Sequence, residues 1–269
     1  MQLLTCKKIK EYELEKLKKI TIDKDLKLVI IKIGDFPENV VYLNSKKKLA
    51  ELLDIEIIEY SYSEITSKEE IISKIKECNE DNKITGIMIQ KPIIEKFNYQ
   101  ELVDYINPLK DVDGVTTYNQ ESIKIIPPTV RAILLLINNY NITLENKKIA
   151  IIGKSNLVGY PLYKLLKDKY HVTLCDSKTS DIKGIITASD IIITAIGRAN
   201  YFTKDYFKDN QIIIDVGTNY LNGKLVGDVD LNNIDSNVSI TPVPGGIGLL
   251  TPVCLFLNLL DMNGEVWNI

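Results

Sequence analysis

The segment at residues 148–161 constrains the fold most strongly, because it combines a buried strand, a glycine-containing loop and the start of a helix. The strand is apolar after its first residue and ends at Gly153. The small residues Ser155 and Gly159 follow before a helix begins near Tyr160. This pattern is related to the dinucleotide-binding fingerprint without matching it. Such a loop brings backbone N–H groups and a helix N-terminus close to a pyrophosphate. The loop alone is equally compatible with a simple tight turn.

Strands and helices alternate over the rest of the chain, which favours an α/β fold with largely parallel sheets. The strands from residue 148 onward predict a Rossmann-type unit, and the first 120 or so residues predict another β/α unit. Strands are expected at 26–33, 55–60, 84–89, 171–175, 190–196 and 211–216. Helices are expected at 7–20, at 39–53, from a capping box at Ser67 and Glu70 to about residue 78, at 133–139, and from 249 to about 260.

Composition limits the class of protein. The chain has 269 residues, of which 45% are hydrophobic and 26% are charged, so a packed protein with two modest domains or one large one is expected. The formal net charge of −3 gives no strong attraction to nucleic acid or to an anionic membrane. No apolar stretch approaches the length of a membrane span, and no signal peptide is visible. We therefore expect a cytoplasmic protein without nucleic-acid or membrane partners.

Histidine and cysteine usage argues against several kinds of site. The single histidine, His171, opens an apolar run and is expected to lie at the start of a strand in a structural role. Serine–histidine catalysis and a histidine-rich metal site are therefore not expected, and no metal is predicted. The four cysteines are far apart and form no CxxC pair, which fits a reduced protein.

Candidate cofactor ligands follow the strands of the Rossmann-type unit, because ligands bind at the carboxyl ends of parallel strands. Asp176 and Ser177 come directly after the strand at 171–175, where a residue that binds the cofactor ribose belongs. A solvated turn carboxylate is the alternative interpretation of Asp176. The predicted cofactor-binding residues are Gly153, Lys154, Ser155, Val158, Gly159, Asp176, Ser177, Gly197 and Gly217.

Five short motifs occur along nearly the whole chain. They are Tyr42 with Lys46, residues 86–90 with Pro92, residues 110–114, residues 153–161 and residues 241–248. In that order they resemble YxxxK, GILVQLP, KDVDG, GRSxxVGxP and TPVPGGVG, which are motifs of the bifunctional methylenetetrahydrofolate dehydrogenase/cyclohydrolase family. KDVDG and TPVPGG are the most specific of the five.

The resemblance implies two reactions. 5,10-Methylenetetrahydrofolate would give a hydride to NAD(P)⁺ and become a methenyl cation, which water would convert to 10-formyltetrahydrofolate. The resemblance also implies an N-terminal α/β substrate domain and a Rossmann-type NAD(P)-binding domain, with a cleft between them, in a homodimer. The expected substrate domain comprises residues 1–120, completed by a C-terminal helix at 250–269, and the expected NAD(P)-binding domain comprises residues 121–249.

Lys46 is the candidate for proton transfer in the hydrolysis, because the chain offers no suitable histidine. A lysine in this role needs a pKa lowered by desolvation and by a nearby cationic substrate. Tyr42 lies one helical turn earlier on the same face, where its ring would stack on the aryl group of the substrate. The family resemblance assigns these roles to the two residues. The alternative is that Lys46 is simply solvated, like most lysines in a run such as residues 46–48.

The remaining site residues lie in loops or at strand ends. Gln90 is expected to orient Lys46 or a carbonyl, and Asp113 is expected to accept hydrogen bonds from the pterin ring. Each also has a plainer interpretation as a residue that forms a turn. The residues predicted to bind substrate are Tyr42, Pro242, Gly245 and Gly246. The loop that contains the last three allows close approach to the folate or nicotinamide, and a tight connection into the last helix is its plainer interpretation.

Several positions depart from the family's patterns, and the cofactor preference depends on some of them. The arginine of GRS is Lys154 here, and the usual HS pair is Asp176 and Ser177. An acidic residue at this strand end suits the free ribose of NAD, whereas the family's pattern suits the 2′-phosphate of NADP. We expect NADP, with NAD as the alternative. The other departures are residues 127–132, Asn39, Lys91, Leu249 and Leu250.

Three other functions remain open from the sequence. The first is a dehydrogenase whose Lys46 has an ordinary pKa, so that hydrolysis of the methenyl product is negligible. The second is a non-catalytic folate- or nucleotide-binding protein with a reshaped loop at 127–132. The third, from the fold pattern alone, is a shikimate-type dehydrogenase, which would leave the TPVPGG loop and the YxxxK helix unexplained.

Overall fold

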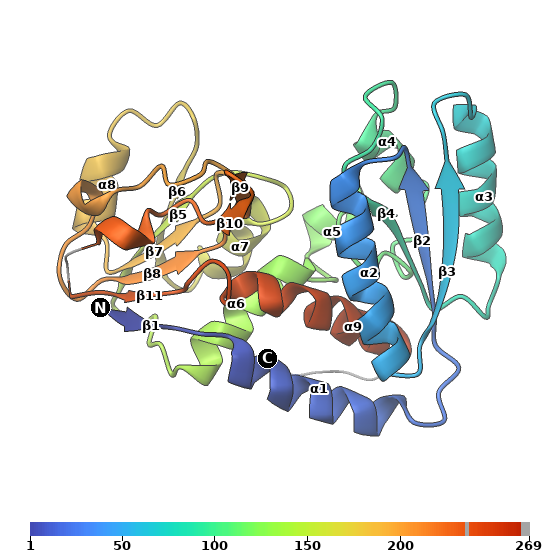
Figure 1. The fold of residues 1–269 in the computed structure, drawn as a ribbon, viewed down its shortest axis with the longest axis horizontal. Helices are drawn as coiled ribbons and strands as arrows, with labels where there is room; N and C mark the ends of the chain where they lie inside the picture. Colours follow the sequence, from blue (N-terminus) through green and yellow to red (C-terminus); the bar gives the residue numbers. More distant parts are fainter. Residues whose placement is uncertain (235–236, 265–269) are drawn as a thin grey trace. The chain divides into compact units, whose positions relative to one another are not determined.

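The computed structural model describes residues 1–234 and 237–264, apart from the side chains of residues 38 and 41. The chain divides into two compact units (Figure 1). Residues 12–128 and the C-terminal segment from Pro252 form one, here called the three-stranded unit. Residues 1–11 and 129–251 form the other, here called the six-stranded unit. Each contains a parallel sheet with helices, as the alternation of strands and helices predicts.

The sheet of the three-stranded unit has β2 (Lys27–Ile33) at its centre, with β3 (Glu56–Tyr62) and β4 (Gly86–Gln90) parallel to it on either side. Residues 28–31 of β2 are fully buried, as expected for a strand of a parallel sheet that is covered on both faces. The helices of this unit are α2 (Pro37–Leu52), α3 (Lys68–Glu80), α4 (Tyr99–Val103) and α5 (Thr117–Ser122), with most of α1 (Lys7–Thr21) and of α9 (Thr251–Met262).

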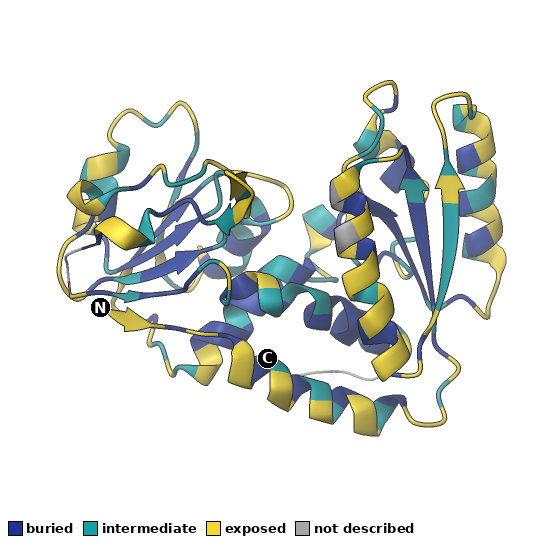
Figure 2. Cartoon of the chain, in the orientation of Figure 1, coloured by how far each residue is buried: buried dark blue, intermediate teal, exposed yellow. Residues whose placement is uncertain are grey.

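Side-chain alternation along β2 separates the two faces of this sheet. Val29, Ile31 and Ile33 are buried in a cluster with Ile71 and Ile75 of α3. The residues between them point to the opposite face, from which α2 contacts the sheet. Figure 2 shows buried residues on β2 and β4, intermediate and exposed ones on the edge strand β3, and exposed residues recurring along α3. The predicted capping box starts α3, since its N-cap serine accepts a hydrogen bond from a backbone N–H three residues on at 3.1 Å.

The six-stranded sheet is entirely parallel, with the order β1-β11-β8-β7-β5-β6. The chain passes from β6 across β5 to β7, so the strand order reverses beside β5. The strands are β1 (Gln2–Leu3), β5 (Lys148–Ile152), β6 (His171–Cys175), β7 (Ile191–Thr194), β8 (Ile212–Asp215) and β11 (Ser239–Ile240). The helices α6 (Pro128–Asn139), α7 (Gly159–Leu166) and α8 (Ile182–Ala188) accompany them, and β9 (Asn219–Leu221) pairs with β10 (Lys224–Val226) in a hairpin.

The first residues of the chain belong to the six-stranded unit, although the sequence analysis placed them in the first domain. Leu3 of β1 pairs with Ile240 of β11 at the edge of the six-stranded sheet. Leu4 N then donates to Ile240 O at 2.8 Å, and Cys6 N donates to Gly245 O at 2.9 Å. A two-residue strand carries no readable alternation, so the sequence pattern does not indicate this pairing.

Four further findings concern features that the sequence singled out. Within the described residues, no helix is both long and apolar enough to cross a bilayer, and no group of three or more metal-binding side chains occurs. His171 is the first residue of β6, as expected, and all four cysteines are free and buried.

Candidate active site

Lys46 and Gln90 are joined by a short hydrogen bond from Nζ to Oε1, 2.6 Å long. Lys46 lies on α2, and Gln90 is the last residue of β4. Gln90 is paired with Lys32 of β2, so its side chain lies on the face away from Ile31 and Ile33 and the α3 cluster. Because α2 contacts this face, its lysine reaches the carboxyl end of β4. The structure therefore brings two of the predicted site residues together.

The Gln90 amide is held in one orientation by a second hydrogen bond. Its Nε2 donates to the backbone oxygen of Lys91 at 2.6 Å, which leaves Oε1 to accept from the Lys46 amine. Gln90 is 5% exposed and Lys46 is partly buried. Burial lowers the pKa of Lys46, and the nearby Asp113 opposes this by raising it. A neutral amine that donates to Gln90 keeps its lone pair available to accept a proton.

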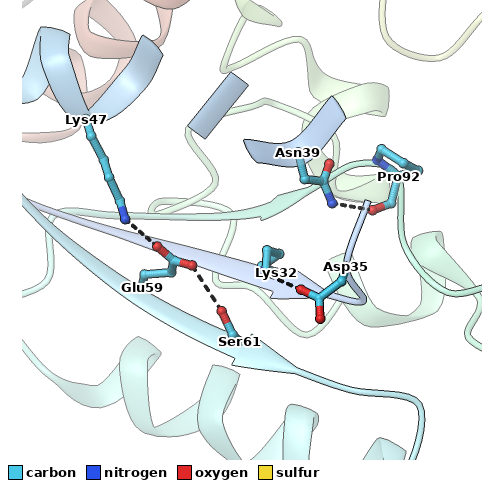
Figure 3. Close-up of polar contacts among 7 residues, drawn as sticks. All are labelled: Lys32, Asp35, Asn39, Lys47, Glu59, Ser61 and Pro92. Atoms are coloured by element: carbon cyan, nitrogen blue, oxygen red, sulfur yellow. Dashed lines mark hydrogen bonds and ion pairs between the residues drawn. The ribbon is translucent and has the colours of Figure 1, made fainter. Parts of the chain in front are cut away.

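The neighbouring Lys47 has a different partner (Figure 3). Its Nζ donates to Glu59 Oε2 at 2.6 Å, and Glu59 Oε1 accepts from Ser61 Oγ at 3.0 Å. Lys47 and Lys48 are exposed, whereas Lys46 is partly buried. The run of three lysines is therefore not uniform, and the residue that reaches the strand end is Lys46.

Asp113 is close enough to Lys46 for the two charges to interact. Burial raises the pKa of Asp113 to about 6, Lys46 lowers it, Asp111 raises it and Lys91 lowers it. Asp111 is fully buried and has a structural role, since its Oδ2 accepts from Thr116 N at 2.8 Å and from an asparagine side chain at 2.9 Å. These bonds shape the loop that carries Asp113.

Lys91 is a second basic residue at this site, and the sequence analysis noted it only as a departure from the family's pattern. Its Nζ lies 3.8 Å from the centroid of the Tyr99 ring, within cation–π range. Burial lowers the pKa of Lys91, and Asp113 raises it. Burial, together with Asp113 and Asp111, raises the pKa of Tyr99. The signal in the sequence is a charge directly after Gln90, where the family's pattern has an apolar residue.

The start of α2 is anchored by Asn39, another departure from the family's pattern (Figure 3). Its Nδ2 donates to Pro92 O at 2.9 Å, and the residue is fully buried. Two helical turns later, Lys46 bonds to Gln90. Tyr42 lies between these two contacts along the helix and is 40% exposed. The helix thus holds Tyr42 and Lys46 near the end of β4.

The loop after β5 has a shape that depends on two glycines. Gly153 has a φ of +114°, and a Cβ on it would overlap the backbone oxygen of Ala195. A Cβ on Gly159 would overlap the backbone oxygen of Gly153. Val158 is the N-cap of α7, so the helix begins directly after this loop at the end of β5. In its first turn Tyr160 N donates to Ser155 O at 3.0 Å and Pro161 has no N–H, so the donors available to a phosphate are those of the loop itself. Lys154 and Ser155 are exposed in this loop, which therefore offers backbone N–H groups, a hydroxyl and an amine to a phosphate.

The turn after β6 is shaped by Asp176. Its Oδ1 accepts from Lys178 N at 2.9 Å, and its own N–H donates to Thr179 Oγ1 at 3.0 Å. Ser177 is exposed beside it. The structure thus shows the turn-forming role of Asp176 that the sequence analysis gave as an alternative. Its contact with a ribose, and that of Ser177 with a phosphate, stay predictions.

The two remaining glycines of the predicted cofactor set differ from each other. Gly197 has a φ of +67°, and a Cβ on it would meet nothing within 4 Å, so the space beside it is open. Gly217 is buried, and a Cβ on it would overlap the carboxylate of Asp228. Gly217 is therefore needed for packing inside the unit, and its contact with the cofactor stays a prediction.

The loop at residues 241–248 is tightly folded. Gly245 has a φ of +111°, and its oxygen accepts from Cys6 N at 2.9 Å. A Cβ on Gly246 would lie 2.6 Å from Pro242 O, and Pro242 itself is buried. The loop leads through a short 3₁₀ turn into α9. This geometry accounts for the glycines as parts of a tight connection, and their contact with substrate stays a prediction.

Comparison with known proteins identifies the family. Residues 4–113 match the family described as tetrahydrofolate dehydrogenase/cyclohydrolase, catalytic domain, and residues 127–266 match its NAD(P)-binding domain. The chain belongs to the tetrahydrofolate dehydrogenase/cyclohydrolase family. The bifunctional protein FolD of Lactobacillus acidophilus is 41% identical over 229 residues, which are 82% of this chain and 81% of that protein. A crystal structure of the bifunctional methylenetetrahydrofolate dehydrogenase/cyclohydrolase FolD from Campylobacter jejuni has a TM-score of 0.92 and 33% identity, covering 98% of this chain and 99% of the other.

Family membership also decides against one alternative from the sequence. Shikimate 5-dehydrogenase from Thermus thermophilus covers 90% of this chain, with a TM-score of 0.53 and 12% identity. That likeness shows a related fold alone. The matched family accounts for both units of the chain, so the shikimate-type interpretation is not needed.

Sequence reasoning missed two buried carboxylates in the NAD(P)-binding part of this family member. Asp215 ends β8 and is 2% exposed, and Asp228, two residues after β10, is fully buried. Both stand near glycines in the sequence, where an aspartate suggests a turn. Because their partners are mostly backbone N–H groups, no residue pattern points to their contacts.

Proposed function

We propose that this protein oxidises 5,10-methylenetetrahydrofolate to the 5,10-methenyl form with NADP⁺ and hydrolyses the methenyl form to 10-formyltetrahydrofolate. Family membership supports both reactions, and the similar enzyme from Campylobacter jejuni is described by both activities. The observation that best supports the hydrolysis is the hydrogen bond from Lys46 to Gln90, because burial lowers the pKa of this amine.

The three-stranded unit is proposed to bind the folate, and the six-stranded unit the dinucleotide. The match of residues 4–113 to the family's catalytic domain, and of residues 127–266 to its NAD(P)-binding domain, supports this division. Lys46, Gln90 and Asp113 all lie in the three-stranded unit. The glycine loop after β5 lies in the six-stranded unit.

The loop after β5 fits the pyrophosphate of a dinucleotide, because Gly153 and Gly159 permit the tight passage from strand to helix and Lys154 and Ser155 between them are exposed. The Ser155 hydroxyl and the backbone N–H groups of the loop would hold the phosphates. Lys154 and Ser177 would hold the 2′-phosphate of NADP, with NAD as the alternative, which Asp176 favours. When bound, NAD(P)⁺ supplies the hydride acceptor.

The folate would be held by three features of the chain. Asp113 would accept hydrogen bonds from the pterin amino and ring N–H groups, which requires its ionised form. The Tyr42 ring, which is 40% exposed, would stack on the aryl group of the substrate. Pro242, Gly245 and Gly246 would allow a close approach to the folate or to the nicotinamide.

In the hydrolysis, Lys46 is proposed to move protons while Gln90 fixes its position. Water adds to the cationic methenyl carbon, and the neutral amine of Lys46 takes one of its protons. The resulting ammonium then donates that proton to N5 as the bond between the carbon and N5 breaks. The hydroxyl of the adduct loses its proton to solvent as the formyl group forms on N10. One proton is released for each methenyl cation hydrolysed.

The proposal extends to assembly and location. We propose a homodimer in the cytoplasm, on the basis of the family resemblance. Sedimentation of the purified chain would test the dimer, and a mass of one chain over the assay concentrations would contradict it.

The experiment that tests the proposed function uses the purified protein with methylenetetrahydrofolate and either NADP⁺ or NAD⁺. Reduced cofactor is followed by absorbance, and methenyl loss is followed separately with authentic methenyltetrahydrofolate against the rate without protein. The proposal predicts cofactor reduction and accelerated methenyl loss. Reduction without accelerated loss would identify a dehydrogenase alone, and binding without turnover would identify a non-catalytic binding protein.

A further inference from the structure

Two buried carboxylates, Asp215 and Asp228, form hydrogen bonds at the carboxyl ends of β7 and β8, and the proposed mechanism uses neither of them. Asp228 is fully buried and Asp215 is 2% exposed. Burying an ionised carboxylate is costly unless hydrogen bonds replace its hydration. The contacts that replace the hydration therefore indicate what these residues hold in place.

The Asp228 carboxylate binds the backbone on both sides of Gly197. Its Oδ2 accepts from Ile196 N at 2.7 Å, and its Oδ1 accepts from Arg198 N at 2.8 Å. Oδ1 also accepts from Asn219 Nδ2 at 3.1 Å. One side chain thus fixes the Ala195–Ile196 and Gly197–Arg198 peptide groups, and Gly197 itself is left facing open space.

Asp215 in turn holds the segment that carries Asp228. Its Oδ1 accepts from Asp228 N at 3.1 Å and from Gly217 N at 2.9 Å, and its Oδ2 accepts from Val229 N at 2.9 Å. A Cβ on Gly227 would overlap the Asp215 carboxylate. The two carboxylates therefore form one packed layer with Gly217 and Gly227, and this layer supports the loop at residue 197.

This layer lies beside the point where the strand order reverses. β5 has β6 on one side and β7 on the other, and the chain crosses β5 between them. Ligands of such sheets bind at this switch point, outside the carboxyl ends of the strands. Gly153 follows β5 there, and Gly197 follows β7 by three residues. A Cβ on Gly153 would overlap Ala195 O, so the two strand ends are in contact.

We propose that Asp228 is a positioning residue for the cofactor-dependent step, which shapes the Ile196–Arg198 backbone so that Gly197 can contact the dinucleotide. The inference rests on the proposed function, because it assumes that a dinucleotide binds at this switch point. Asp228 does not touch the cofactor. It acts through the backbone of the loop, where two N–H groups need a common acceptor.

An aspartate suits this position better than an asparagine. Two of the groups that donate to Asp228 are backbone N–H groups, and each is bound by a different carboxylate oxygen. An amide of the same shape would turn its NH₂ toward one of them, so one bond would become a contact between two donors. Asp228→Asn therefore changes the loop while nearly preserving volume.

The test compares Asp228→Asn with Asp230→Asn in the full-length protein. Asp230 is two residues away and binds Asn233 Nδ2 through its side chain, so it provides the same chemical change outside the layer. The measurements are KM and kcat for NADP⁺ in the oxidation, equilibrium binding of NADP⁺, and the rate of methenyl hydrolysis. Asn219→Ala removes only the side-chain donor to Asp228 and serves as a milder second variant.

We expect Asp228→Asn to raise KM for NADP⁺ roughly 10-fold, from the loss of one buried hydrogen bond. Hydrolysis should stay within about twofold, because its proposed residues lie in the other unit, and Asp230→Asn should resemble the wild type. A parallel fall in both activities would indicate a structural role and overturn the inference. So would wild-type cofactor binding and turnover in a folded Asp228→Asn protein.

Should Asp228→Asn not fold, Asn219→Ala decides, with a smaller rise in KM supporting the inference and an unchanged KM overturning it. Should the wild type bind NADP⁺ without reducing it, the proposed function fails. The inference is then judged by the change in NADP⁺ binding alone.

Discussion

The amines of Lys46 and Lys47, adjacent in the sequence, bind side chains from opposite edges of the three-stranded sheet. Lys46 reaches Gln90 on β4, and Lys47 reaches Glu59 on β3, each at 2.6 Å. Consecutive helix positions are rotated by about 100°, which is enough to send the two side chains to different edge strands. The pair therefore offers a comparison in which the same residue type is removed from two environments one residue apart.

Lys46→Met should lower the rate of methenyl hydrolysis by roughly 10²–10⁴-fold, because it removes the amine that Gln90 holds in position for proton transfer. Substrate should still bind, since Asp113 and Tyr42 are unchanged. The measurement is the rate of methenyl loss together with the folate dissociation constant of the variant.

Lys47→Met is the matched control for that change. It removes an exposed pair with Glu59, which contributes about 0–1 kcal/mol to stability, and it should hydrolyse at the wild-type rate. Equal rates for Lys46→Met and wild type would remove Lys46 from the mechanism. Equal losses in the two variants would show that the lysine run acts through its charge rather than through Lys46.

Acidification should weaken folate binding as Asp113 takes up a proton. Burial raises the pKa of Asp113 to about 6, so its carboxylate is ionised above that value and increasingly protonated below it. KM for methylenetetrahydrofolate should therefore rise as pH falls below about 6.

Because this pKa lies above that of an unfolded aspartate, the folded state holds the proton more tightly. The group's contribution to stability is thus present at low pH and lost as pH rises through about 6.

Lys91→Leu tests how far a neighbouring positive charge sets the pKa of Asp113. Lys91 lowers the pKa of Asp113, so its removal should raise that pKa and move the rise in KM to higher pH. Lys96→Leu is a suitable control, because its amine binds the backbone oxygens of Glu64 and Thr66. If Lys91→Leu leaves the pH dependence of KM unchanged, Lys91 does not influence the ionisation of Asp113.

Gly197→Ala should impair the cofactor step more than it impairs folding. A left-handed φ of +67° costs alanine about 1–2 kcal/mol, and its Cβ would meet no protein atom. Gly223→Ala, at the β9–β10 hairpin, has a φ of +75° and equally open surroundings. Both variants should lose similar free energy of unfolding in urea, and only Gly197→Ala should raise KM for NADP⁺. An equal KM in the two variants would place the dinucleotide away from Gly197.

The parts of the site that sequence predicts are those tied to motifs. The loop after β5 is predictable because Gly153 and Gly159 satisfy steric demands of their own strand and helix. Lys46 and Gln90 are 44 positions apart, and only the family resemblance puts them in one site. Their direct bond follows from the pairing of β4 with β2, which places Gln90 on the face that α2 contacts.

The parts that sequence does not predict depend on partners without a pattern. Asp228 binds the backbone N–H groups of Ile196 and Arg198, and a backbone donor gives no information about residue type. The pairing of β1 with β11 joins two-residue strands more than 200 positions apart, too short for alternation to be read. Local periodicity predicts elements well, whereas contacts between distant elements need the folded chain.

Asp176→Ser should shift the cofactor preference toward NADP. The carboxylate lies in the turn after β6, and a negative charge there would repel a 2′-phosphate by about 1 kcal/mol or more at 4 Å. The ratio of kcat/KM for NADP⁺ to that for NAD⁺ should therefore rise about fivefold or more. The turn should persist, because a serine Oγ can also accept from Lys178 N.

Asp181→Ser is the control, since Asp181 caps α8 by accepting from Gly184 N at 2.9 Å, and a serine can replace it there. Its cofactor ratio should equal that of the wild type. If Asp176→Ser also leaves the ratio unchanged, the Asp176 carboxylate serves the turn alone and takes no part in choosing the cofactor.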